Sequence, residues 1–466
     1  MIWLCLLACG GTKPADTAVR VDTATATSTS TPPTTTASGS TTPPTIMPDV
    51  LTVPAPAEDL DPAPEVLRVQ FRAAPHTYTA AGVTVDGFAY NGQVPGPTLR
   101  AEVGTQLVVE LVNDLDTATT IHWHGPRDVP FAMDGVPWLS EPVPPGGRFE
   151  YSFTLTHAGT FWYHPHFDTE RQVDLGLYGA LVVEDSAEPT TDHDQVWVFD
   201  AMGEEAAGDL HHHGFEPLPS QWTVNGQDNP LLAVTGGEVV RARLINVSNT
   251  GYLRLTWPDA RQIAGGQGLL PSPVPVEELV LGPGERAEIE LTPGESEQVL
   301  TTLPHSLAGP SAFGDPSPLV TLARTGAAPV TGPEWGSGPL SPSPDPGTTD
   351  VVYVFQGDER TGEWRINGEA FPEVTIETLP LGADAVIEVR NLSPSHHPFH
   401  LHGLHFELLS RNGVAPPQVM VADTLDLAVR DVVRLRVVAD NPGDWMAHCH
   451  ILPHAEGGMM TVLRVE

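Results

Sequence analysis

The chain has 466 residues, 40% of them hydrophobic, which is enough for about three domains of roughly 150 residues each. Its formal net charge of −37 comes from 59 acidic residues against only 22 basic ones. A strongly acidic surface repels nucleic acid, and no basic patch interrupts it, so we exclude nucleic acid as a partner. We interpret the charge as a contribution to solubility, with attraction for cationic substrates as the alternative.

The chain opens with a short apolar segment, MIWLCLLACGG, which is too short to span a bilayer. Residues 6–9, LLAC, resemble a bacterial lipobox, because an aliphatic residue stands three positions before the cysteine and a small one directly before it. We therefore predict a lipoprotein-type signal peptide over residues 1–9, cut before a lipidated Cys9. The protein would then be exported and held by its lipid in the periplasm or on the cell surface, at the outer membrane if the source has two membranes. A plain secretory signal or a wrongly chosen start codon is the alternative, since no Lys or Arg precedes the apolar run.

A polar segment follows the apolar start. Thr, Ser, Pro and Ala dominate residues 12–48 and cannot bury a core, so we predict a disordered tether over residues 10–66. Of the three cysteines, Cys5 and Cys9 belong to the leader, and Cys449 is the remaining thiol. The sequence therefore predicts a folded part without a disulfide framework.

From about Leu67 onward, short apolar runs alternate with turn residues, and no long stretch has a helical period with caps. The pattern occurs three times. A W-x-x-N-G segment at 222–227 and again at 364–371 precedes an alternating strand that ends in Asn. We predict an all-β chain of three consecutive β-sandwich domains. The predicted segments are domain 1 over residues 67–186, domain 2 over 187–325, a Pro/Gly/Ser-rich linker over 326–349, and domain 3 over 350–466.

Histidines occur in four His-x-His pairs, two in the first predicted domain and two in the third. On a strand, the two imidazoles of such a pair share one face. Eight imidazoles without a carboxylate or thiol exceed what one mononuclear site can use, so they predict a metal cluster. The pairs are His122 and His124, His164 and His166, His400 and His402, and His448 and His450.

Cys449 stands between the last two histidines and would point to the opposite face of the same strand. With His397, His454 and Met459 it gives two His, one Cys and a weak Met, the ligand set of a blue-copper site. Zinc is the obvious rival, but a structural zinc would not need eight imidazoles and a thioether. One strand would thus serve two metal sites.

In order and spacing, these clusters resemble those of three-domain multicopper oxidases, the laccases and bacterial copper oxidases. The resemblance covers residues 67–466 and implies that the three consecutive domains are cupredoxin-like Greek-key β-sandwiches. It also implies four copper ions, one type 1, one type 2 and two type 3. It implies that His397, Cys449 and His454 hold the type 1 copper, with Met459 as axial ligand and Met460 as the neighbouring alternative. It implies that His122 and His400 hold the type 2 copper. The implied type 3 ligands are His124, His164, His166, His402, His448 and His450.

The same resemblance implies a route for electrons and protons. Cys449 would take an electron from the type 1 copper, and His448 and His450 would deliver it to the cluster, where dioxygen is reduced to water. The middle domain would be a spacer. Asp134 is either an acid near the cluster or part of a simple Asp-Gly turn. Glu456 lies one position after the place where many bacterial relatives carry an acid, so a second proton carrier is left open.

The electron donor is the least determined part of the function. Dedicated cuprous oxidases of this family often carry a Met-rich insertion in the third domain, whereas residues 356–364 read QGDERTGEW, without methionine. We expect an uncovered type 1 site, with the edge of His454 open to phenols and aromatic amines, and Cu(I) as the alternative donor. A copper-free structural protein of the cell envelope is disfavoured, because every ligand position is intact. We expect a monomer, and we interpret His211–His213 as a solvated turn.

Overall fold

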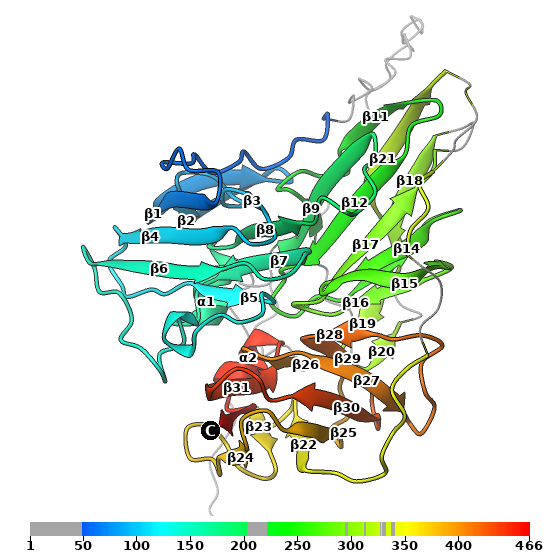
Figure 1. Ribbon diagram of the computed structural model, residues 1–466. Helices are drawn as coiled ribbons and strands as arrows, with labels where there is room; N and C mark the ends of the chain where they lie inside the picture. Colours follow the sequence, from blue (N-terminus) through cyan, green and yellow to red (C-terminus); the bar gives the residue numbers. More distant parts are fainter. Residues whose placement is uncertain are drawn as a thin grey trace, which may run out of the picture. The chain divides into compact units, whose positions relative to one another are not determined.

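The computed structural model describes residues 49–202, 221–293, 297–311, 314–326, 328, 332–336 and 341–466. The predicted leader with Cys9, most of the predicted tether, His211–His213 and parts of the predicted linker lie outside these ranges. No helix within the described ranges is long and apolar enough to cross a membrane. The chain folds as three successive pairs of β-sheets, coloured blue to cyan, green to yellow, and gold to red in Figure 1. The prediction of an all-β chain is confirmed.

The first sheet pair covers Val66–Glu184 and encloses an apolar core around Phe71, Leu107 and Phe161. One sheet has the order β2-β1-β4-β6 and the other β3-β8-β7-β5. Strand β1 pairs antiparallel with β2 and parallel with β4. The strands are β1 (Val66–Ala80), β2 (Val83–Tyr90), β3 (Leu99–Glu102), β4 (Gln106–Asn113), β5 (His122–His124), β6 (Arg148–Thr154), β7 (Gly159–His164) and β8 (Gly179–Glu184).

The second sheet pair covers His193–Thr325 and has its own core around Trp197, Leu244 and Leu300. Its sheets have the orders β10-β9-β12-β17-β14-β15 and β11-β21-β18-β13-β16, and β19-β20 forms a small hairpin. The strands are β9 (His193–Met202), β10 (Gln221–Val224), β11 (Leu231–Thr235), β12 (Val240–Asn246), β13 (Leu253–Thr256), β14 (Arg261–Gly265), β15 (Gly268–Pro275), β16 (Leu279–Leu281), β17 (Arg286–Leu291), β18 (Gln298–Thr302), β19 (His305–Ser306), β20 (Gly309–Pro310) and β21 (Ser317–Thr325).

The third sheet pair covers Val351–Val465, with a core around Tyr353, Phe399 and Trp445. Its sheets have the orders β23-β22-β25-β30-β27-β28 and β24-β32-β31-β26-β29. The strands are β22 (Val351–Asp358), β23 (Glu363–Ile366), β24 (Glu377–Leu379), β25 (Asp384–Asn391), β26 (His397–Leu401), β27 (Phe406–Arg411), β28 (Val421–Ala422), β29 (Thr424–Leu427), β30 (Val432–Val438), β31 (Gly443–Cys449) and β32 (Met460–Val465).

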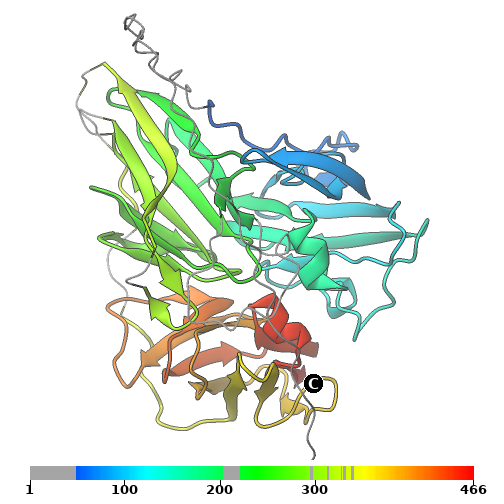
Figure 2. The same ribbon diagram turned by 180° about the vertical axis from the view of Figure 1, so that it is seen from behind.

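Within the described ranges, three short helices lie outside the sheets: η1 (Phe131–Met133), α1 (Thr169–Asp174) and α2 (Leu452–Glu456). Helix α1 belongs to the first sheet pair and α2 to the third, and the two helices lie side by side (Figure 2). The backbone N–H of Glu170 donates to Glu456 Oε1 at 2.9 Å. The histidine-bearing strands β5, β7, β26 and β31 therefore end at one junction between the first and third sheet pairs.

The predicted tether extends too far along the chain. Residues 49–66 are ordered, because the backbone N–H of Leu51 donates to Leu231 O at 2.8 Å and its side chain is buried in the core of the second sheet pair. Gln227 Oε1 also accepts hydrogen bonds from the N–H and hydroxyl groups of Thr52. An apolar side chain and paired backbone groups hold this stretch, although its composition is that of a linker.

Candidate metal centre

The four His-x-His pairs converge at the junction of the first and third sheet pairs. In register, His122 lies opposite His164 on β5 and β7, and His400 lies opposite His448 on β26 and β31. Seven of the eight imidazoles are buried, and His166 is half-buried. The alternation that the sequence predicted thus brings the eight rings from two distant parts of the chain into one cluster, the histidine cluster.

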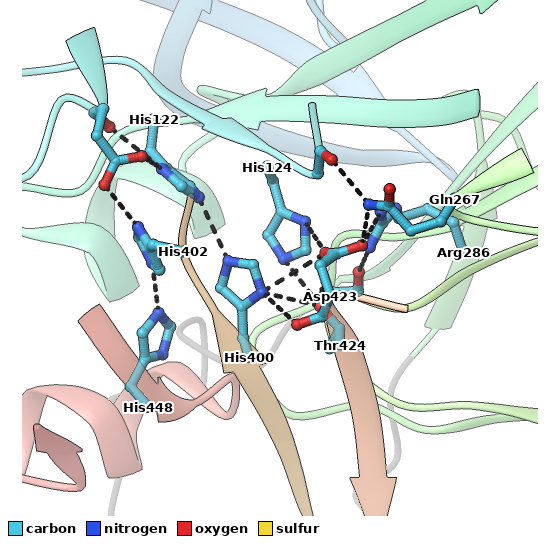
Figure 3. Close-up of polar contacts among 12 residues, drawn as sticks. His122, His124, Gln267, Arg286, His400, His402, Asp423, Thr424 and His448 are labelled. Atoms are coloured by element: carbon cyan, nitrogen blue, oxygen red, sulfur yellow. Dashed lines mark hydrogen bonds and ion pairs between the residues drawn. The ribbon is translucent and has the colours of Figure 1, made fainter. Parts of the chain in front are cut away.

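Ring nitrogens face one another across this cluster. His122 Nε2 and His400 Nε2 are 3.5 Å apart, and His402 Nε2 and His448 Nε2 are 2.9 Å apart (Figure 3). The donor atoms of His122, His400 and His402 lie within 4.8 Å of one another, as do those of His166, His402 and His448. This is the spacing of ligands around a shared ion.

Several of these nitrogens lack any protein partner. Both ring nitrogens of His450, and Nε2 of His164, are buried without a hydrogen bond to any described residue. Buried polar atoms are almost always paired, because an unpaired one costs about 1–3 kcal/mol. The unpaired nitrogens therefore fit metal ions, which accept their lone pairs.

Burial keeps these imidazoles neutral. Desolvation lowers the pKa of His124 to about 3 and that of His448 to about 4. Desolvation, followed by the neighbouring histidines, also lowers the pKa of His164, His400 and His402 well below the usual value. A neutral imidazole has a free lone pair, so the cluster is ready to bind metal at neutral pH.

Hydrogen bonds on the outer side of the rings select which nitrogen faces inward. His164 Nδ1 donates to Pro165 O and His448 Nδ1 to Cys449 O, both at 2.8 Å. His400 Nδ1 donates to Asp423 O at 3.0 Å. Because a carbonyl oxygen only accepts, the proton is on Nδ1 and the lone pair of Nε2 is available to metal.

Asp134 holds two of the rings. Its Oδ1 is 3.0 Å from His122 Nδ1, its Oδ2 is 2.8 Å from His402 Nδ1, and its side chain is buried. The carboxylate therefore joins a histidine of the first sheet pair to one of the third. Of the two readings of Asp134 from sequence, the structure supports an acid at the cluster.

Asp423 is a second carboxylate at the cluster, and the sequence did not single it out. Its Oδ2 is 3.2 Å from His124 Nδ1, and Arg286 Nη2 lies 2.6 Å from its Oδ1. Burial alone raises the pKa of Asp423, but the charge of Arg286 and the hydrogen bond from His124 outweigh it and hold that pKa well below its usual value. Nothing in the local sequence distinguishes Asp423 from other acids, because its partners come from distant strands.

A second set of donors lies inside the third sheet pair. Cys449 Sγ is 3.4 Å from His397 Nδ1 and 3.7 Å from His454 Nδ1, and these two nitrogens are 3.1 Å apart. The outer nitrogens are occupied, since His397 Nε2 lies 2.5 Å from Ser393 Oγ and His454 Nε2 lies 3.2 Å from Glu359 Oε1. Two imidazoles and a thiol therefore point at one position.

The thioether and the thiol fit this position too. Met459 is fully buried in the same core as Cys449, whereas Met460 packs in a separate cluster with Val136 and Met446, which favours Met459 as the fourth ligand. Burial raises the pKa of the Cys449 thiol well above its usual value. Only a bound cation would make a thiolate stable there, and this donor set suits copper.

Comparison with known proteins agrees with this chemistry. Residues 73–188 and 343–466 match two family models that are both described as multicopper oxidase. The chain is 30% identical over 401 residues to a multicopper oxidase of Staphylococcus haemolyticus, covering 81% of this chain and 83% of that protein.

The chain belongs to the multicopper oxidase family.

Solved structures show the same fold. A multicopper oxidase from Pseudomonas thermotolerans superposes with a TM-score of 0.74 at 31% identity, over 87% of this chain and 100% of that one. A laccase-like multicopper oxidase from Ochrobactrum, described as active towards lignin model compounds and lignosulfonate, superposes with a TM-score of 0.77 at 26% identity, over 89% and 100%. The cupredoxin-like fold is therefore confirmed, and the protein is a copper-dependent oxidoreductase that uses dioxygen and four copper ions.

One sequence-based expectation about this oxidase is wrong. The edge of His454 is not open, since only 2% of the residue is exposed. The Trp364 ring stacks on it with centroids 3.6 Å apart, and Glu359 contacts its Nε2. Trp364 on β23 and Glu359 in the segment between β22 and β23 therefore supply the cover that we expected to be missing.

A cavity of about 300 Å³ adjoins the histidine cluster of the oxidase, since His164, His166 and His448 are among its lining residues. Asp168 and Glu456 also line it, together with apolar residues. Burial raises the pKa of Glu456. The acid that the sequence left open as a second proton carrier therefore lies on the wall of the cavity.

Proposed function

We propose that this oxidase removes electrons one at a time from phenols and aromatic amines at the Cys449 site and passes them to the histidine cluster, where dioxygen is reduced to water. Copper, when bound, supplies the one-electron redox chemistry and the binding of dioxygen. The observation that carries the proposal is the shared strand β31. On β31, Cys449 belongs to one donor set and His448 to the other, and His450, which directly follows the strand, has its ring beside those of His124 and His400. Peptide bonds join the three residues directly.

The proposed ligand sets follow the family resemblance, and one distance supports the first of them. We assign His122 and His400, whose Nε2 atoms face each other at 3.5 Å, to the type 2 copper. The type 1 copper is assigned to His397, Cys449, His454 and Met459. The remaining imidazoles are assigned to the type 3 pair, namely His124, His164, His166, His402, His448 and His450.

In this proposal, Glu359 is the residue that contacts the electron-donating substrate. Its Oε1 accepts from Ser395 Oγ at 3.0 Å and contacts His454 Nε2, while no described residue hydrogen-bonds its Oε2. A phenol O–H or an aromatic amine N–H can donate to this carboxylate. With copper bound at the type 1 site, one electron of the donor would leave by way of His454 and the proton of the donor would pass to Glu359, so that the oxidised donor is a neutral radical. A carboxylate in contact with His454 therefore suits donors that release a proton on oxidation.

Oxidation of metal ions is the second candidate, because a carboxylate at the type 1 site also attracts cations. Two features disfavour Cu(I) as the main donor. Asp358, the adjacent acid, is engaged by Arg360 at 2.5 Å, and residues 356–364 contain no methionine. Soft Cu(I) prefers thioether and thiolate ligands to carboxylate oxygens.

On the dioxygen side, we propose that the cavity lined by His164, His166 and His448 admits dioxygen to the cluster. Asp134 lies behind the rings of His122 and His402, so any effect it has on proton supply acts through those two imidazoles. It is a positioning residue in this scheme.

Export and a lipid anchor at Cys9 complete the proposal. The lipobox at residues 6–9 and the Thr/Ser/Pro-rich segment after it support an oxidase domain held near a membrane surface by its lipid. The proposed oxidase acts as a monomer.

Steady-state assays of Glu359→Gln and the exposed control Glu363→Gln test the proposed donor. We expect kcat/KM for a phenol to exceed that for Cu(I) in the wild type, and to fall about tenfold in Glu359→Gln because a charge-assisted hydrogen bond is lost. Ferrocyanide, which has no proton to give, should not lose rate. Equal loss with phenol and ferrocyanide, or a much higher wild-type kcat/KM for Cu(I), would contradict the phenol assignment.

A further inference from the structure

None of the predicted copper ligands lies in the second sheet pair, and the family resemblance implied only a spacer role for it. Its loops nevertheless reach the histidine cluster. Arg286 begins β17, and Gln267 lies in the turn between β14 and β15. Both side chains end on Asp423 of the third sheet pair, beside His124 and His400 (Figure 3).

Arg286 binds Asp423 with both ends of its guanidinium group. Nη2 donates to Oδ1 at 2.6 Å and Nη1 to Oδ2 at 2.9 Å. Its Nε donates to Thr160 O, on β7 of the first sheet pair, at 3.1 Å. One buried side chain of the second sheet pair therefore bonds to both sheet pairs that carry the copper ligands.

Gln267 makes a parallel set of contacts. Its Nε2 donates to Asp423 Oδ1 and to Gly125 O, both at 2.7 Å, and Gly125 directly follows His124. Its Oε1 lies 3.0 Å from His157 Nε2. The Asp423 carboxylate is thus fixed from two directions by the second sheet pair.

Asp423 in turn orients two histidines of the cluster. Oδ2 is 3.2 Å from His124 Nδ1, and the backbone carbonyl accepts from His400 Nδ1 at 3.0 Å. Thr424 Oγ1, which is 3.0 Å from Asp423 Oδ2, is also 3.0 Å from His400 Nδ1. A bidentate guanidinium leaves this carboxylate one orientation, whereas a point charge would leave several.

The second sheet pair also touches a third histidine. Gly284, in the turn before β17, has a φ of +80°, and a Cβ there would lie 2.7 Å from His450 Cδ2. Since neither ring nitrogen of His450 hydrogen-bonds to a described residue, packing holds the ring in place. The glycine backbone forms one wall of that packing.

We propose that the second sheet pair is a positioning element of the copper cluster. Arg286 and Gln267 lock Asp423, and through it His124 and His400, while Gly284 sets the place of the His450 ring. This inference rests on the proposed copper assignment. It adds that the cluster needs all three sheet pairs, although only two supply its ligands.

Arg286→Lys, compared with Arg243→Lys, tests this proposal. Arg243 is an equally buried arginine on β12 that binds Asp194 and Glu288 and contacts no cluster histidine. In the copper-loaded full chain we would measure copper per chain, the type 2 electron paramagnetic resonance signal, copper loss to a chelator, blue absorbance and thermal unfolding. We expect Arg286→Lys to lose cluster copper about tenfold faster, the lower end for groups that orient metal-bound histidines. Blue absorbance and KM for the donor should stay constant while kcat falls.

Arg243→Lys should lower the unfolding temperature and keep the wild-type copper. If both variants lose copper at the same rate, the second sheet pair is a scaffold only and the proposal fails. If Arg286→Lys does not fold, Gln267→Met replaces it, and we expect a smaller increase in the rate of copper loss in that variant. Copper retention equal to that of the wild type in Gln267→Met would overturn the proposal. Absence of blue absorbance in the wild type would contradict the copper assignment itself, so the two failures are distinguishable.

Gly284→Ala against Gly382→Ala gives an independent test. Gly382 has the same φ of +80° with open space around its Cβ position, so backbone strain is matched. We expect only Gly284→Ala to alter the type 3 copper, seen as a new resonance signal from the normally silent pair. A silent pair in Gly284→Ala, with full copper content, would remove Gly284 from the proposal.

Discussion

Replacing Asp134 by alanine should loosen the histidine cluster in an asymmetric way. His122 Nδ1 also contacts the backbone carbonyl of residue 134 at 3.1 Å, and that acceptor survives the substitution. For His402 Nδ1, the Asp134 carboxylate at 2.8 Å is the hydrogen-bond acceptor among the described residues, and it is lost. Losing the orienting partner of one metal-bound histidine costs about 10–100-fold in metal affinity, or about 1.4–2.8 kcal/mol.

The assay is copper retention and reoxidation by dioxygen of the fully reduced, copper-loaded enzyme. We expect Asp134→Ala to keep its blue absorbance, to lose cluster copper faster, and to show slower reoxidation. Asp134→Asn can still accept one of the two hydrogen bonds, so it should be intermediate. Asp200→Asn is the matched control, because Asp200 is a buried acid that accepts from Tyr178 Oη at 2.6 Å without touching a histidine. Wild-type retention and reoxidation in Asp134→Ala would refute this reasoning.

Three further predictions concern access, acid stability and location. Trp364→Ala should expose His454 and lower KM for bulky phenols, at a stability cost of about 3–5 kcal/mol. Trp364→Phe should keep His454 covered. Unchanged KM values in Trp364→Ala would contradict the role of the Trp364 ring. The copper-free protein should lose stability as the pH falls from about 6.5 towards 4, because imidazoles such as His124 and His448, with folded pKa values of about 3 and about 4, bind protons only after unfolding. Each such imidazole lowers the free energy of unfolding by about 1.4 kcal/mol for each pH unit below 6.5 in that window. A free energy of unfolding that does not change between pH 6.5 and 4.5 would contradict the burial of these imidazoles in the neutral form. Cys9→Ala should accumulate an unprocessed precursor without attached lipid, and metabolic labelling that finds no lipid on the wild type would leave a soluble secreted enzyme.

The convergence of the predicted donor side chains could be anticipated from sequence, because the residue types and their spacing are local features of each strand. A His-x-His pair on a strand fixes which face both rings occupy, and Cys449 between two histidines fixes the opposite face. The family motif then supplied the partners across domains. The fold class was predictable for the same reason, since short alternating runs recur along the chain.

The supports of the site were not predictable in this way. Asp423 and Arg286 lie 137 positions apart, and their pairing depends on how the sheet pairs pack. The cover over His454 was mispredicted because Trp364 was identified as part of a repeated W-x-x-N-G strand motif, while its stacking depends on the path of the neighbouring segment. The ordered stretch near Leu51 was missed because one buried leucine outweighs a linker-like composition.

Copper content and colour of Cys449→Ser, measured beside the wild type, test the central claim most directly. The account holds that one thiol joins two donor sets on β31. The wild type should bind four copper ions per chain and be intensely blue, as a Cys thiolate bound to Cu(II) in a His₂Cys site requires. Cys449→Ser should be colourless and inactive towards every donor while the histidine cluster keeps its copper. A blue, active Cys449→Ser protein would contradict the account.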